Sequence, residues 1–109
     1  MHINAIGAYR PDMAEIPASV VCRARVIVDH RESALEEAGD LIIPLNQGLF
    51  QQSHLNTELG EILIGSLPGR KNPDEVTLFK SVGVAIQDLY AADRALDNAR
   101  RLDLGVELP

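Results

Sequence analysis

Three short apolar runs, separated by segments that favour helix, constrain the fold of this chain more than any other feature. The runs cover residues 3–7, 25–29 and 76–81, and each is rich in aliphatic, β-branched or aromatic side chains without a helix-length repeat. Parallel strands require long crossover connections, usually helical, and segments of that kind lie between these runs. The sequence therefore predicts an α/β fold, with a parallel sheet of about three strands flanked by helices.

The connecting segments carry the helical patterns. Residues 12–18 favour a short helix or turn closed by Pro17. Helices are expected over residues 31–38, with Gly39 as the cap, and over residues 55–64.

The last third of the chain favours one long helix, from about residue 84 to residue 101. Its apolar residues form one stripe at three- and four-residue spacing, which is typical of a core-facing helix but also suits a docking surface: Ala85, Ile86, Leu89, Ala92, Leu96 and Ala99. The run of residues 41–45 stays ambiguous, because Pro44 excludes a regular central strand.

Composition and charge narrow the class of protein. The 109 residues are 46% hydrophobic but only 4% aromatic, so aliphatic side chains must build the core of a single domain. The formal net charge of −6 argues against nucleic acid as a partner. No apolar stretch reaches the roughly 20 residues that span a bilayer, so no membrane partner is expected and a cytoplasmic location is the default. The single cysteine, Cys22, is expected to be a small core residue.

Candidate site residues lie where the predicted strands end, at residues 7–10, 29–31 and 81–83. Arg10 could present its guanidinium to a carboxylate or phosphate, or it could be a solvated arginine paired with Asp12, and the residues leave both open. The three histidines lack metal-ligand spacing, so no metal site is predicted. The sequence has no glycine-rich phosphate loop of the G-x-G-x-x-G or Walker type, and hence no complete nucleotide-binding fingerprint of its own.

Six short blocks of the sequence form an ordered set. They are HINAIGAYRPDM at 2–13, VD at 28–29 with RE at 31–32, EAGDL at 37–41, ELGEI at 58–62, PGR at 68–70 and TLFKSVG at 77–83. In this order and at this spacing they resemble the C-terminal part of the ornithine cyclodeaminase and mu-crystallin family. The resemblance covers residues 2 to about 95, nearly the whole chain.

The resemblance implies a longer, homodimeric enzyme that uses NAD or NADP, in which a dimerisation domain and a glycine-rich cofactor loop precede the matched region. Residues 1–83 would form the C-terminal half of a Rossmann-like NAD(P)-binding domain, and residues 84–109 a helix and tail returning toward the dimerisation domain. The positions that match cofactor-binding residues are Asn4, Ala5, Ile6 and Ser81, and Arg10 matches a position that borders the substrate pocket. No catalytic residue is assigned.

Tyr9 departs from the family pattern. Members that cyclise ornithine carry a catalytic aspartate there, and a phenol cannot act as a carboxylate base. The resemblance therefore favours an NAD(P)-dependent oxidoreductase that reduces a cyclic imino acid, a ketimine, or interconverts an amino acid and its imine. The alternatives are ornithine cyclodeaminase, a non-catalytic truncated remnant and a small-ligand-binding protein, and the isolated chain is expected to be inactive.

Overall fold

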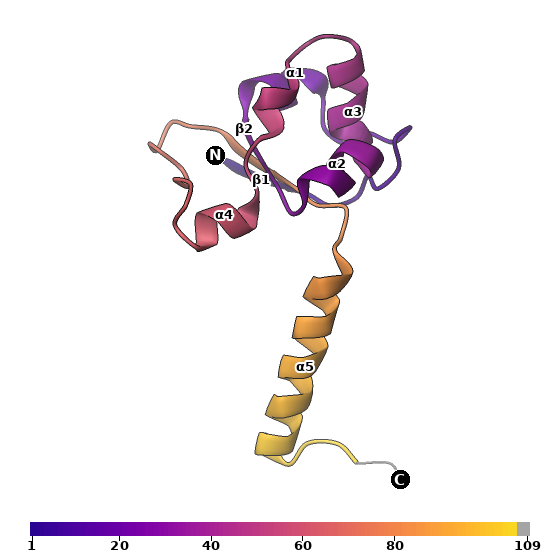
Figure 1. Cartoon of the computed structure of the whole chain (residues 1–109), viewed down its shortest axis with the longest axis vertical. Helices are drawn as coiled ribbons and strands as arrows, with labels where there is room; N and C mark the ends of the chain where they lie inside the picture. The colour runs from indigo at the N-terminus through magenta and orange to yellow at the C-terminus, as the bar shows by residue number, and fades with distance from the viewer. Residues whose placement is uncertain (107–109) are drawn as a thin grey trace.

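A small α/β body carries one long projecting helix in the computed structural model, which describes residues 1–106 (Figure 1). The molecule extends over 56 Å along its longest axis but only 21 Å along its shortest. The long helix lies along the longest axis, so the body itself occupies only part of this length.

The sheet has three parallel strands, β1 (His2–Ala5), β2 (Arg25–Val28) and β3 (Thr77–Lys80). Their order is β1-β3-β2, so the last strand in the sequence lies in the middle. Ala5 and Val28 both pair with Lys80, and the three strands therefore end at the same level. The predicted parallel sheet is confirmed, with strand ends within one or two residues of the apolar runs.

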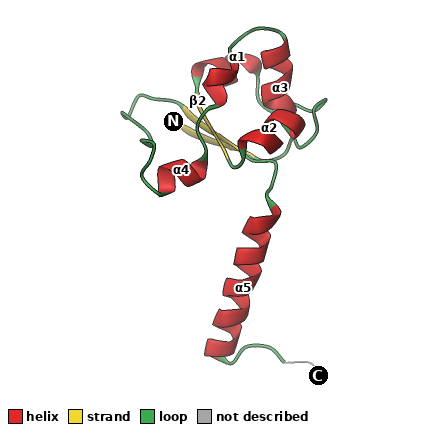
Figure 2. Ribbon diagram, in the orientation of Figure 1, coloured by secondary structure: helices red, strands yellow, loops and turns green. Residues whose placement is uncertain are grey.

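Residues of the strands alternate between the two faces of the sheet. One face joins a buried aliphatic cluster with side chains of α1 (Ala18–Arg23), α2 (Arg31–Glu37) and α3 (Gly39–Asn46), and its strand residues are Ala5, Val26, Val28 and Leu78. The opposite face lies against α4 (Leu59–Leu63). Figure 2 shows α1, α2 and α3 close together and α4 apart from them.

The first helix follows Pro17 instead of ending at it. Residues 11–16 form turns and bends, and α1 begins at Ala18. Proline has a fixed φ and no N–H group, a combination that suits the start of a helix, and the Pro17 carbonyl accepts a hydrogen bond from the Val20 N–H at 2.9 Å. Cys22, which lies on α1, is only partly buried and is not the core residue that the sequence predicts.

Gly39 begins α3 instead of capping α2. A Cβ atom at this position would lie 2.1 Å from the carbonyl oxygen of Met13 and 2.7 Å from that of Arg10. Glycine is required because the helix and the loop approach each other this closely. The ambiguous run of residues 41–45 is helical and contains Pro44, which cannot donate the usual hydrogen bond to the preceding turn of α3.

The single helix predicted over residues 55–64 is in fact two short segments. A 3-10 helix, η1 (Gln52–Leu55), is followed by an extended stretch, and α4 begins only at Leu59. In the extended stretch the Thr57 carbonyl accepts a hydrogen bond from the Val28 N–H at 2.9 Å. Pairing with the end of β2 therefore interrupts the helical pattern.

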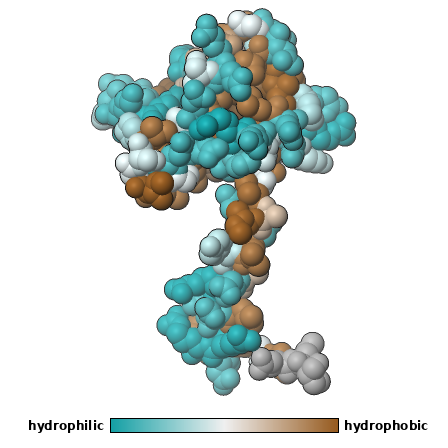
Figure 3. All heavy atoms as spheres, in the orientation of Figure 1, coloured by the Kyte–Doolittle hydropathy of each residue, from teal (hydrophilic) through white to brown (hydrophobic). Residues whose placement is uncertain are grey.

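The predicted long final helix is confirmed as α5 (Ala85–Leu102). None of its residues is buried, and Leu89 and Leu96 are 63% and 50% exposed. Figure 3 shows hydrophobic side chains along one side of this helix. The apolar stripe is therefore no part of this chain's core, and its return toward a dimerisation domain stays a prediction. Residues 107–109 of that predicted unit lie outside the described residues, and no helix within residues 1–106 is long and apolar enough to cross a membrane.

Candidate cofactor and substrate site

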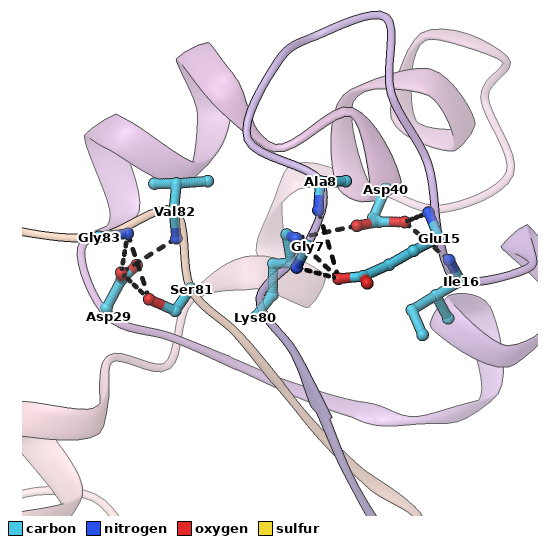
Figure 4. A network of polar contacts seen from close by, with 10 residues as sticks. All are labelled: Gly7, Ala8, Glu15, Ile16, Asp29, Asp40, Lys80, Ser81, Val82 and Gly83. Atoms are coloured by element: carbon cyan, nitrogen blue, oxygen red, sulfur yellow. Dashed lines mark hydrogen bonds and ion pairs between the residues drawn. The ribbon is translucent and has the colours of Figure 1, made fainter.

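The carboxyl ends of the three strands bring together the segments in which the sequence predicts site residues. The loop of residues 6–17 follows β1, Asp29 follows β2, and residues 81–84 follow β3. The Ser81 N–H donates to the Ala5 carbonyl at 3.1 Å, so β1 and β3 stay joined up to this edge. Figure 4 shows two polar clusters here, one around Asp29 and one around Glu15.

Asp29 fixes the turn between β3 and α5. Its Oδ2 accepts hydrogen bonds from the Ser81 hydroxyl at 2.6 Å, the Gly83 N–H at 3.0 Å and the Val82 N–H at 3.1 Å. Gly83 has a φ of 90°, in the left-handed region that favours glycine. Because the Ser81 hydroxyl gives its one proton to Asp29, it can act toward a ligand only as an acceptor.

Glu15 holds the loop that follows β1. Its Oε1 accepts hydrogen bonds from the Gly7 N–H at 2.7 Å and the Ala8 N–H at 3.4 Å. The same oxygen lies 3.4 Å from Nζ of Lys80, and the Glu15 side chain is 37% exposed. The start of the loop therefore rests on a carboxylate at the protein surface.

Lys80 and Asp40 form an ion pair in which neither side chain has exposed surface. The Lys80 Nζ lies 3.0 Å from Asp40 Oδ2, so the two opposite charges attract each other at close range. Asp40 Oδ1 accepts hydrogen bonds from the N–H groups of Glu15 and Ile16 at 2.7 and 2.8 Å. Burying two charges costs several kcal/mol per ion, which their attraction and these hydrogen bonds offset. The pair ties the central strand to α3 and to the loop.

A cavity of about 450 Å³ lies on the sheet face beside α4. Thr77 Oγ1 contacts Nδ1 of His2 at 2.7 Å and accepts a hydrogen bond from Arg70 at 2.9 Å. Asn4 lies on the same face, with its Oδ1 at 3.0 Å from Nε2 of His2. His2 and Thr77 begin their strands, so this cavity reaches to the amino ends of the sheet, away from the edge that carries Asp29 and Glu15.

The predicted site residues differ in what they can offer a ligand. Ile6 is 70% exposed at the carboxyl edge, whereas Ala5 is 1% exposed and can present only its backbone. Arg10 makes two hydrogen bonds to Asp12, at 2.8 and 3.1 Å, with 61% of its side chain exposed. The surface pairing that the sequence leaves open is thus present. Within residues 1–106 no group of three or more His, Cys, Asp or Glu side chains could hold a metal ion.

Comparison with known proteins decides the family. The model of the ornithine cyclodeaminase/mu-crystallin family matches residues 1–102. The chain belongs to this family. It is 42% identical over 106 residues to the Δ1-pyrroline-2-carboxylate reductase of Bacillus cereus. This match covers 96% of this chain and 33% of the reductase. It is 39% identical over 97 residues to mouse ketimine reductase mu-crystallin, covering 89% and 28% of the two chains.

A solved member of the family has the same arrangement of elements. The Thermococcus litoralis Δ1-pyrroline-2-carboxylate reductase, in complex with NADH and L-proline, gives a TM-score of 0.90 at 39% identity. The match covers 99% of this chain and 33% of that one. The chain therefore spans about a third of the length of the family members it matches.

Glu15, Asp40 and Lys80 are absent from the predicted site residues, although Asp40 and Lys80 lie within the family-like blocks at 37–41 and 77–83. A signal was available, because period-two alternation places Lys80 on the same face of β3 as Leu78, which is the core face. A lysine on a core face requires a buried carboxylate. The sequence does not say which acidic residue supplies it, since Asp40 is 40 positions away and only the fold brings the two together.

Proposed function

We propose that this chain is the C-terminal third of an NAD(P)-dependent oxidoreductase that reduces a cyclic imino acid to the corresponding amino acid. The 42% identity to a Δ1-pyrroline-2-carboxylate reductase, over nearly the whole chain, carries the proposal. Similarity to ketimine reductase mu-crystallin supports the same substrate class, a small imino or amino acid. Tyr9, in place of the cyclodeaminase aspartate, disfavours the cyclisation of ornithine.

The carboxyl edge of the sheet suits the nicotinamide end of the cofactor. NAD(P)H would supply the hydride when bound, as one solved relative binds NADH. Ser81, restricted to accepting hydrogen bonds, suits a donor such as the nicotinamide carboxamide N–H. The exposed Ile6 offers apolar surface to the ring, Ala5 offers its backbone, and Asn4 offers an amide on the neighbouring face. The pyrophosphate has no glycine-rich loop here, and we assign its binding to the part of the relatives outside the match.

Arg10 is the proposed partner of the substrate carboxylate. Its present partner, Asp12, holds it in an exposed ion pair, and pairs of this kind contribute about 0–1 kcal/mol. The guanidinium can therefore exchange Asp12 for a substrate carboxylate with little loss of free energy. A planar guanidinium can also bind a carboxylate through two parallel hydrogen bonds, which would orient the imino acid.

A chimera tests the proposal, in which this chain replaces the matching third of the Thermococcus litoralis reductase. We expect the chimera to oxidise NADH when Δ1-pyrroline-2-carboxylate is added and to leave ornithine unchanged. Arg10→Ala should lower kcat/KM for the imino acid by roughly 10- to 150-fold, the equivalent of one charge-assisted hydrogen bond of about 1.5–3 kcal/mol. The matched control is Arg23→Ala, which removes an exposed arginine of α1 and should leave kcat/KM unchanged.

Two results would contradict the proposal. A folded chimera that binds NADH but transfers no hydride to any cyclic imino acid would refute the reductase assignment. If Arg10→Ala keeps kcat/KM within about twofold of the parent, Arg10 is a surface residue and does not hold the substrate.

A further inference from the structure

The loop between β1 and α1 carries Ile6 and Arg10, which are proposed to contact cofactor and substrate, yet it contains no helix or strand. Its backbone is held at two points. Near its start, the Gly7 N–H donates to Glu15 Oε1 at 2.7 Å. Near its end, the Glu15 N–H donates to Asp40 Oδ1 at 2.7 Å. Glu15 takes part in both, through its side chain at the first point and its backbone at the second.

Lys80 supports the carboxylate of Glu15. Its Nζ lies 3.4 Å from Glu15 Oε1 and 3.0 Å from Asp40 Oδ2, so two carboxylates share one ammonium group. The lysine side chain has no exposed surface, and a buried ammonium group is costly unless carboxylates face it. This cost favours conformations in which the Glu15 carboxylate stays over Lys80, directly beside the start of the loop (Figure 4).

Gly7 fits this carboxylate sterically. A Cβ atom at Gly7 would lie 2.4 Å from Glu15 Oε2, a distance that real Cβ contacts do not reach. A side chain at Gly7 would therefore require the Glu15 carboxylate to move from its present position. The shape of the loop and the position of Glu15 are therefore coupled.

We propose that Glu15 is a positioning residue, which sets the backbone of residues 6–10 so that Ile6 and Arg10 face the carboxyl edge of the sheet. The roles of Ile6 and Arg10 in this inference rest on the proposed function. The role of Glu15 in holding the loop rests on its hydrogen bonds and its ion pair. In this proposal Glu15 acts through the loop and not by contact with substrate or cofactor. Asp40 would still face Lys80 in a chain without Glu15, so we expect loss of Glu15 to loosen the loop and to leave the sheet intact.

Nuclear magnetic resonance of the whole 109-residue chain, without cofactor, tests the proposal. We expect Glu15→Ala to raise the amide hydrogen-exchange rate of Gly7 about tenfold or more, because a hydrogen bond to a charged acceptor is lost. The order parameter of the Ile6 methyl group falls in the same variant, while exchange from the β3 amides stays within about twofold. Glu15→Gln keeps an acceptor oxygen and should restore most of the Gly7 protection. Glu75→Ala is the matched control, since Glu75 accepts a hydrogen bond from the Lys71 N–H at 2.8 Å in another loop.

Each outcome bears on the proposal. Gly7 exchange and Ile6 order that stay at parental values in Glu15→Ala would overturn it. Faster exchange throughout β3 would also overturn it, because Glu15 would then stabilise the whole body and not the loop. The measurements need no bound ligand, so failure of the chimera to reduce an imino acid would remove the proposed function and leave this result standing.

Discussion

Replacing Asp40 by asparagine removes the negative charge from the buried ion pair and changes almost nothing else. The amide keeps the Oδ1 acceptor for the N–H groups of Glu15 and Ile16, at 2.7 and 2.8 Å. The oxygen that faces Lys80 at 3.0 Å becomes an uncharged NH2 group. Breaking a buried pair on one side costs about 3–5 kcal/mol. Glu15 Oε1 remains 3.4 Å from the ammonium group, so we expect a loss of about 3 kcal/mol in the free energy of unfolding.

Urea unfolding, followed by far-ultraviolet circular dichroism, measures this loss. A loss of about 3 kcal/mol is a large part of the 5–15 kcal/mol that is the typical unfolding free energy of a whole domain. Asp12→Asn is the control, because the Arg10–Asp12 pair is 61% and 67% exposed and should contribute about 0–1 kcal/mol. The double variant Asp40→Asn with Lys80→Met should lose less unfolding free energy than Asp40→Asn alone, since no buried cation is left without a partner. The reasoning is refuted if Asp40→Asn costs under about 1 kcal/mol, or if the two substitutions are simply additive.

Two further predictions concern the packing of the loop and the exposed helix. Gly39→Ala should lower the unfolding free energy by about 1–3 kcal/mol, because the new Cβ would meet the Met13 carbonyl oxygen at 2.1 Å. Gly60→Ala is the control and should be neutral or stabilising, because a Cβ there would have no atom within 4 Å. Thermal unfolding compares the two, and equal transition temperatures would show that α3 and the loop can separate without loss. The apolar stripe of α5 should make the chain self-associate at micromolar concentration in sedimentation experiments, and Leu89→Asp, at a position 63% exposed, should weaken that association. A parent chain that sediments as a monomer contradicts this expectation.

The strands and the last helix could be predicted because their patterns are local. β2 coincides with the apolar run of residues 25–29, and α5 coincides with an apolar stripe that repeats over five helical turns. The predicted helix ends at Pro17 and Gly39 are wrong, because neither residue type by itself shows on which side of it a helix lies. For Gly39 the deciding contact is with carbonyl groups of residues 10–13, which are far away in the sequence.

The candidate site could likewise be predicted only in part from the sequence. That the strand ends meet at one edge follows from the parallel arrangement, and this places Ser81 near Asp29. The sequence does not show that Ser81 donates its proton to Asp29, because this depends on the register of β2 and β3. The roles of Asn4, Ala5, Ile6 and Arg10 come from the family resemblance and stay predictions. The division of the chain at residue 83 likewise stays a prediction.

The position of β3 between β1 and β2 has a consequence for synthesis on the ribosome. β1 and β2 each pair with β3 and not with each other. The paired residues His2 and Thr77 lie 75 positions apart in the sequence. Neither the β1–β3 nor the β2–β3 pairing can form until residues 77–80 have left the exit tunnel. Such long-range pairing also slows folding in general. A chain cut before Thr77 would keep most of its aliphatic residues but lose the strand with which both β1 and β2 pair.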